Sequence, residues 1–135
     1  MSYLLVGLGG IIGSLLRYYV GLFTHSWWPY NFPLGTLLIN LLGCFILGWF
    51  TYRIIKMELF HPYILSGVST GLIGSFTTFS SFSVETVTLI NHHLWELALL
   101  YVLLSLFGGL FMTWMGHRVG EKGARKFQGK KAKTS

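Results

Sequence analysis

Four long apolar runs constrain what this chain can fold into. They cover about residues 3–23, 34–52, 62–90 and 97–116, and short polar or aromatic segments separate them. A bilayer core of about 30 Å is crossed by about 20 helical residues at about 1.5 Å each. The pattern therefore predicts an all-α integral membrane protein with four transmembrane helices and both termini on the same side.

The charged residues support this interpretation. They make up only 10% of the chain, whereas a soluble domain carries about 25%. Seven of the ten Lys and Arg residues lie from Arg118 onward. We therefore expect a four-helix transmembrane domain over residues 1–118 and a basic, disordered cytoplasmic tail over residues 119–135. Basic charge confined to a tail does not favour a nucleic-acid partner, and anionic lipid is the expected contact.

The distribution of Lys and Arg also predicts orientation. The side that holds the termini and the second loop carries nine of these residues, namely Arg53, Lys56 and the seven of the tail, and the opposite side carries none. Positive charge accumulates on the cytoplasmic side of membrane proteins. We therefore predict a multi-pass protein of the cell membrane with both termini in the cytoplasm.

Motifs of covalent and zinc chemistry are missing from the sequence. It contains no HExxH, CxxC or P-loop pattern and no recognisable Ser, His and Asp set. The five histidines fall in loops or at the ends of the apolar runs, where an interfacial position is the default. We therefore predict that the protein is not an enzyme.

The third apolar run is too long for one straight transmembrane helix. Its 29 residues would make a helix of about 43 Å, well above the hydrocarbon thickness. Six of the ten residues from Gly74 to Ser83 carry hydroxyl groups, which offer the backbone other hydrogen-bond partners. We expect this helix to be broken near Gly74–Thr78, at mid-membrane. Broken helices at that depth line cavities or are buried in protein.

Few ionisable or amide groups lie inside the runs. Arg17 has two interpretations: a functional or paired group, or a side chain that reaches the nearby interface. Glu85 is the natural counter-charge for Arg17, and we expect a structural ion pair between them. Asn40 is either a contact between helices or a source of two N–H donors for an anion.

Side chains at helical spacing suggest a path through the protein. Tyr101 and Ser105 are four residues apart and share one helix face, which Gly109 continues. Phe79 and Phe82 are three apart and project from one side of the segment after the break. Beside Asn40, these groups would combine neutral donors with positive ring edges.

At these residues the sequence resembles the small bacterial fluoride channels, the Fluc or CrcB-like family. Three motifs carry the resemblance: GGIIGSLLRY at residues 9–18, GTLLINLLGCFILG at 35–48 and GLIGSFTTFSSFSVET at 71–86. The resemblance implies passive efflux of fluoride, which lowers its toxicity in the cytoplasm. It also implies an antiparallel dimer with two narrow pores, each of which draws on both chains.

The resemblance assigns roles to particular residues. Asn40, Phe79, Phe82, Tyr101 and Ser105 would line the fluoride path. The main-chain carbonyls of Gly74 and Thr77 would hold a structural sodium ion as cofactor. The chain departs from the family pattern at Ser75, where a second Gly is usual, and at Gly109, where some members carry a hydroxyl.

Two alternatives remain open at this stage. A small four-helix, proton-coupled multidrug exporter has a similar length, but it requires a titratable carboxylate in its binding chamber, and Glu85 is the only candidate. A membrane subunit that only packs against a partner would have little use for Asn40, Phe79 and Phe82. The charge bias also leaves open whether the second subunit of the dimer is another copy or a homologous chain of opposite topology.

Overall fold

A computed structural model describes residues 2–55 and 60–132 of the chain, and the side chains of residues 3–54 and 60–124. Every regular element among these residues is helical. The elements, in chain order, are α1 (Ser2–Trp27), α2 (Leu34–Phe50), η1 (Thr51–Ile55), α3 (Pro62–Ser66), η2 (Gly67–Ile73), α4 (Gly74–Phe76), α5 (Phe79–Asn91) and α6 (Trp95–Ala132). The stretches η1 and η2 are π-helical, with wider turns than the α-helices they join.

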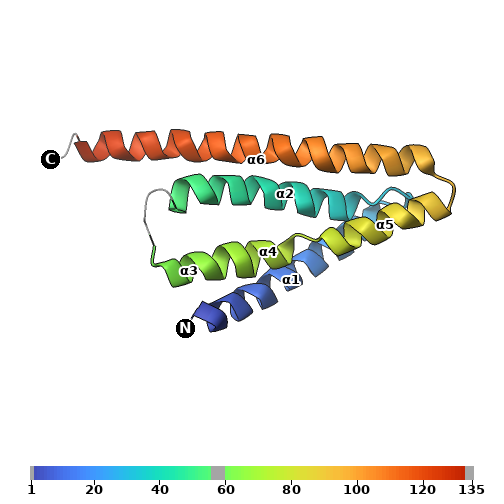
Figure 1. Ribbon diagram of the computed structural model, residues 1–135, viewed down its shortest axis with the longest axis horizontal. Coiled ribbons are helices and arrows are strands. Elements are labelled where there is room, and N and C mark those ends of the chain that lie inside the picture. The colour runs from blue at the N-terminus through green and yellow to red at the C-terminus, as the bar shows by residue number, and fades with distance from the viewer. Residues whose placement is uncertain (1, 56–59, 133–135) are drawn as a thin grey trace.

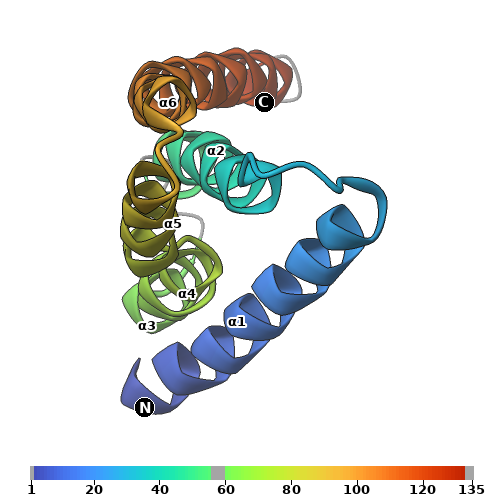
Figure 2. The same cartoon turned by 90° about the vertical axis from the view of Figure 1, so that its right-hand side faces the viewer.

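The chain runs back and forth along the long axis of the molecule, and the N and C marks lie at the same end (Figure 1). Helix α2 packs against α6, and α1 packs against η2 and α4. Figure 2 shows α1 slanting away from the other helices toward the loop that leads to α2. Residues 3–27, 34–54 and 95–124 each form a helix long and apolar enough to cross a membrane.

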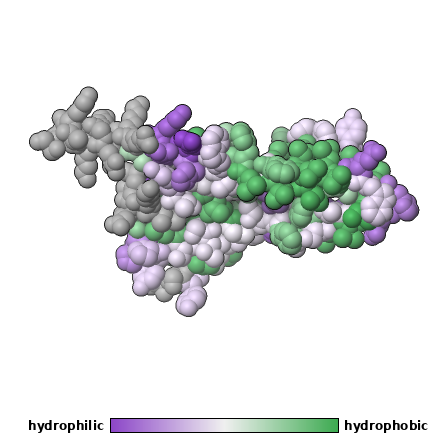
Figure 3. Space-filling view, turned by 45° about the horizontal axis from the view of Figure 1, so that its top comes forward, coloured by the Kyte–Doolittle hydropathy of each residue, from purple (hydrophilic) through white to green (hydrophobic). Residues whose placement is uncertain are grey.

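The hydropathy of the surface agrees with a membrane protein. Green apolar side chains gather over the middle of the face in Figure 3, and purple hydrophilic groups lie toward both ends. Large apolar side chains of α1 and α6 are exposed, including Ile11, Phe23, Phe107 and Leu110. Such exposure suits contact with lipid rather than with water.

Small residues bring α2 and α6 into main-chain contact. A Cβ atom added at Gly48 would meet the main-chain oxygen of Thr113, and one added at Gly116 would meet that of Phe45. Glycine at such positions lets the backbones of two membrane helices approach closely. The α2–α6 pair is therefore closely packed.

The end of the fourth helix differs from the prediction. We expected it to end near residue 116, with a disordered tail from residue 119, but α6 continues to Ala132. Gly120 packs against the main chain of Trp49, and Ala124 is buried. The residues beyond Gly116 include Glu, Lys and Ala, which favour helix. Lys56 and Lys133, which contribute to the predicted orientation, lie outside the described residues.

The buried core lies where α2, α5 and α6 meet. Tyr101 is fully buried there, together with Leu37, Leu89 and Ala98. Phe82 packs against the same cluster. The core therefore holds one side of α5 in place, including the ring of Phe82 near the start of that helix.

Candidate functional site

The third apolar run is interrupted at Thr77 and Thr78. Helix α4 ends at Phe76, both threonines have extended backbones (ψ 156° and 119°), and α5 begins at Phe79. The Thr78 hydroxyl caps α5 by accepting from the N–H of Ser81 at 3.2 Å. Threonine is a good N-cap because its oxygen replaces a missing helical acceptor. The hydroxyl-rich segment thus both ends one helix and starts the next.

Asn40 of α2 holds the interruption from the side. Its Nδ2 donates to the Thr78 carbonyl at 2.9 Å, and its Oδ1 accepts from the Thr78 N–H at 2.8 Å. A side-chain amide thus satisfies both main-chain groups of one extended residue. One of the two Asn40 N–H donors remains for another acceptor.

The same hydrogen bonds release two carbonyl groups from the helix. In a continuous helix, the Thr78 N–H would donate to Gly74 and the Ser81 N–H would donate to Thr77. These donors bond to Asn40 and to the Thr78 hydroxyl instead. The carbonyls of Gly74 and Thr77 therefore lack their helical partners.

Glu85 of α5 is bound by hydroxyl groups rather than by Arg17. One carboxylate oxygen accepts from Thr36 at 2.7 Å and the other from Tyr101 at 2.8 Å. The expected ion pair with Arg17 is wrong: both residues line one cavity, but no ion pair joins them in the described part of the chain. Two hydroxyl donors within reach satisfy the carboxylate without the guanidinium.

Three aromatic rings extend from the interruption toward the core. The centroids of Phe79 and Phe82 lie 5.7 Å apart, and those of Phe82 and Tyr101 lie 5.1 Å apart. Phe79 is 79% exposed, whereas Tyr101 is fully buried. The rings thus form a row that leads from the surface to the Glu85 carboxylate.

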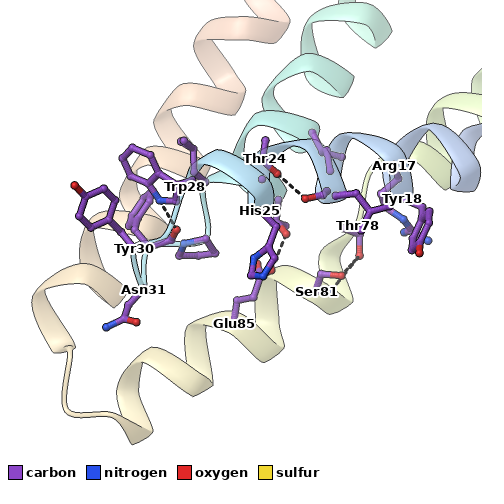
Figure 4. A pocket seen from close by; sticks show the side chains of 18 residues that line it. Arg17, Tyr18, Thr24, His25, Trp28, Tyr30, Asn31, Thr78, Ser81 and Glu85 are labelled. Atoms are coloured by element: carbon purple, nitrogen blue, oxygen red, sulfur yellow. Dashed lines mark hydrogen bonds between the residues drawn. The ribbon is translucent and has the colours of Figure 1, made fainter.

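Two hollows adjoin the interruption. The first, here the polar hollow, has a volume of about 500 Å³ and is bounded by α1, the loop to α2, α2 and α5. Its walls carry Arg17, His25, Ser81 and Glu85 (Figure 4). Thr36 of α2 also lines it. Figure 4 also shows the Thr78 and Ser81 hydroxyls joined at its edge.

The second, here the aromatic hollow, has a volume of about 530 Å³. Six of the residues singled out from the sequence line it: Asn40, Gly74, Thr77, Phe79, Phe82 and Ser105. The Ser105 hydroxyl oxygen is buried, and it has no hydrogen-bond partner within the described residues. Thr78 lines both hollows, so the interruption is the wall between them.

Residues 4–117 match the family model described as CrcB-like protein, Camphor Resistance. The chain belongs to the CrcB-like family. A relative from Bacillus cereus, named fluoride-specific ion channel FluC 1, is 53% identical over 90% of this chain and 88% of its own length. CrcB-like relatives from Geobacillus kaustophilus and Moorella thermoacetica, named FluC 2 and FluC 1, are 43% and 41% identical. These alignments cover 90% and 86% of this chain and 94% and 83% of the relatives.

Sequence reasoning missed two residues of this CrcB-like site, Thr36 and Thr78. Thr36 lies four residues before Asn40, so both lie on one face of α2, and that spacing was the available signal. Thr78 stood in the hydroxyl-rich segment, but nothing in the sequence set it apart from its neighbours. Its two main-chain bonds to Asn40 join residues 38 positions apart, which only the folded chain reveals.

Proposed function

We propose that this chain is a subunit of a fluoride channel that lets fluoride leave the cytoplasm down its electrochemical gradient. One observation carries the proposal: the Asn40 amide binds the interrupted helix where the polar and aromatic hollows share the wall residue Thr78. The names of the relatives support fluoride as the ion.

The proposed path runs from the polar hollow past the interruption into the aromatic hollow. Arg17 brings a positive charge to the first hollow that attracts anions, and the Glu85 carboxylate in the same lining is bound by two hydroxyl groups. Beyond it, the second N–H of Asn40 and the buried hydroxyl of Ser105 offer donors, and the rings of Phe79 and Phe82 offer positive edges. Fluoride is strongly hydrated, so closely spaced donors must replace its water as it moves.

The Glu85 carboxylate distinguishes this proposal from a proton-coupled exporter. Both of its oxygens accept hydrogen bonds, from Thr36 and Tyr101. A carboxylate held in this way is suited to orienting the Tyr101 and Thr36 hydroxyls beside the path. Passive movement of an anion requires no titrating carboxylate.

Flux from liposomes tests the function. The purified chain is reconstituted in liposomes loaded with potassium fluoride or potassium chloride, and valinomycin starts efflux, which ion-selective electrodes follow. We expect rapid fluoride efflux and chloride efflux no faster than from liposomes without protein. Fluoride efflux equal to that from empty liposomes, from a chain that size-exclusion chromatography shows to be dimeric, would refute the proposal.

The proposal includes a second subunit in antiparallel orientation. Ser66, Thr70 and Gly74 are exposed and spaced four residues apart, so they form a small, polar face of the third run. Phe79, beside this face, is 79% exposed. Polar and small residues in membrane helices mark contacts between helices, and a second chain would cover them and complete each path.

The proposal also includes a structural sodium ion between the two subunits. The carbonyls of Gly74 and Thr77 fit this role because their helical donors bond elsewhere, and carbonyl oxygens are suitable ligands for a hard cation. The ion would supply a fixed positive charge near the interruption. Purification in rigorously sodium-free buffer should impair the dimer or the flux, and full activity without sodium would contradict this part.

Both termini are proposed to lie in the cytoplasm, with a homologous chain of opposite topology as the partner in the cell. The support is the bias of nine Lys and Arg residues to none across the membrane, since each is worth about 1 kcal/mol near an anionic leaflet. A C-terminal tag should be inaccessible from outside intact cells. A tag found equally on both faces would indicate a homodimer with dual topology.

A further inference from the structure

Two exposed tryptophans mark the ends of the apolar part of α6. Trp95 begins the helix, and Trp114 lies 19 residues later, about 29 Å along the axis at about 1.5 Å per residue. This distance matches the hydrocarbon core of about 30 Å, and tryptophan side chains gather at both of its boundaries. The lipid headgroups therefore begin near Trp114 and continue toward the C-terminal end of α6.

The helix does not end at this boundary. α6 continues to Ala132 and runs past the end of α2 (Figure 1). Beyond Trp114, Gly120 packs against the main chain of Trp49, and Ala124 is buried. An ordered helix that packs in this way holds the residues after Trp114 at fixed depths relative to the membrane, which a disordered tail does not.

One face of α6 changes from aromatic to basic as it crosses the boundary. Phe111, Trp114, Arg118 and Lys122 follow one another at intervals of three or four residues, and all are exposed. Side chains at this spacing share one helix face. The face points away from α2, because Gly116 on the other side of α6 meets the α2 main chain.

Arg118 and Lys122 lie at the depth of the headgroups. The Arg118 guanidinium lies over the Trp114 ring, 5.3 Å from its centroid. The two basic residues are about 6 Å and about 12 Å beyond Trp114 along the axis, and the headgroup layer of one leaflet is about 5–8 Å thick. Side chains lean toward the N-terminus of their helix. That direction is the membrane side here, so both cations lean back toward the headgroups.

No carboxylate neutralises these two cations in the described part of the chain. Glu121 is the only acid after residue 96. It takes part in an interaction of its own, but among the described residues no ion pair joins it to Arg118 or Lys122. Two cations at headgroup depth without a carboxylate partner are complementary to a phosphate group.

We propose that Arg118, Lys122 and Trp114 form a binding site for the phosphate headgroup of an anionic phospholipid such as phosphatidylglycerol, in the leaflet at this end of α6. Arg118 contacts the phosphate while its guanidinium stays on the Trp114 ring, and Lys122 reaches the same group from one turn outside. The acyl chains lie along the exposed aromatic face that begins at Phe111. The ordered helix thus provides one defined site, where the sequence predicts only a disordered basic tail.

Thermal unfolding of the full chain in a neutral maltoside detergent at about 0.15 M salt tests the site. Phosphatidylglycerol or phosphatidylcholine with the same acyl chains is titrated in, and the mole fraction of lipid that gives half of the maximal stabilisation is measured. A ligand that binds only the folded protein raises its unfolding temperature. For the wild type, we expect phosphatidylglycerol to act at a mole fraction at least about fivefold lower than phosphatidylcholine, because a basic residue near an anionic surface strengthens binding by about that factor.

Variants locate the site. Arg118→Gln and Lys122→Gln should each raise the phosphatidylglycerol requirement by about fivefold and leave the response to phosphatidylcholine unchanged. Trp114→Leu, which removes the ring under the guanidinium, should raise it by about two- to fivefold. The matched control is Lys130→Gln, which removes the same charge about 18 Å farther along α6 than Arg118. That distance exceeds the Debye length of about 8 Å, so the control should bind phosphatidylglycerol as the wild type does.

The possible failures are distinguishable. Equal requirements for the two lipids in the wild type would overturn the inference, as would equal weakening by Lys130→Gln and Arg118→Gln, which would indicate attraction to the net charge. Equal stabilisation by glycerol phosphate, which has no acyl chains, would assign the cations to a free anion and overturn it too. If Arg118→Gln does not purify, Arg118→Lys keeps the charge without the planar fork, and it should still bind phosphatidylglycerol more weakly than the wild type. None of these measurements involves fluoride movement, so the inference and the proposed function can fail separately.

Discussion

The α2–α6 contact and the interruption between α4 and α5 differ in how they use the helical backbone. In the first, Gly48 and Gly116 bring two unbroken helices into main-chain contact. In the second, helical hydrogen bonds are given up, and Asn40 and the Thr78 hydroxyl replace them. The residues of the α2–α6 contact therefore stabilise the fold. Those of the interruption leave polar groups available to a ligand. Substitutions in the first should affect assembly, and substitutions in the second should affect fluoride movement.

The largest effect is expected at the helix contact. Gly48→Ala should destabilise the protein by about 3 kcal/mol, because overpacking of a tight contact costs about 1–3 kcal/mol and here the new carbon meets the main chain of Thr113. Thermal unfolding in detergent measures this. The control Gly7→Ala, where space is open, should unfold like the wild type. Equal unfolding temperatures for both variants would show that the α2–α6 contact is not close-packed.

At the interruption, Asn40→Leu should have an effect of similar size. It leaves the N–H and the carbonyl of Thr78 unpaired, and each unpaired buried group costs about 1–3 kcal/mol. Fluoride efflux should be nearly lost, and the unfolding temperature should drop. Thr88→Val is the control, since the Thr88 hydroxyl donates only to Val84 in its own helix. Wild-type efflux from Asn40→Leu would show that the Asn40 amide is not needed for fluoride movement.

A smaller effect is expected where the two regions meet. Tyr101→Phe removes the hydroxyl that donates to Glu85 but keeps the buried ring. One such hydrogen bond is worth about 1 kcal/mol, so efflux should fall by about fivefold. Thr113→Val, which removes a hydroxyl bonded within α6, should not change efflux. Unchanged efflux in Tyr101→Phe would place the path away from this hydroxyl.

The apolar runs and the family could be predicted from the sequence, because the length of an apolar run and a local motif depend only on residues that are close together in the chain. Prediction from the sequence was wrong where a side chain has several possible hydrogen-bond or ion-pair partners. Glu85 had one obvious counter-charge, yet Thr36 and Tyr101 satisfy it. The sequence predicts a disordered tail over residues 119–135, but Gly120 packs against Trp49 and α6 continues to Ala132. Both outcomes depend on distances between helices, which periodicity along one run does not encode.

The account depends most directly on the two phenylalanines that follow the interruption. Fluoride efflux from liposomes should be measured for Phe79→Ile and Phe82→Ile, with size-exclusion chromatography to show that each variant assembles as the wild type does. We predict that each substitution slows efflux by up to about tenfold, because an aliphatic side chain lacks the positive ring edge and an aromatic contact is worth up to about 1.5 kcal/mol. Wild-type efflux in both variants would contradict a fluoride path through the aromatic hollow.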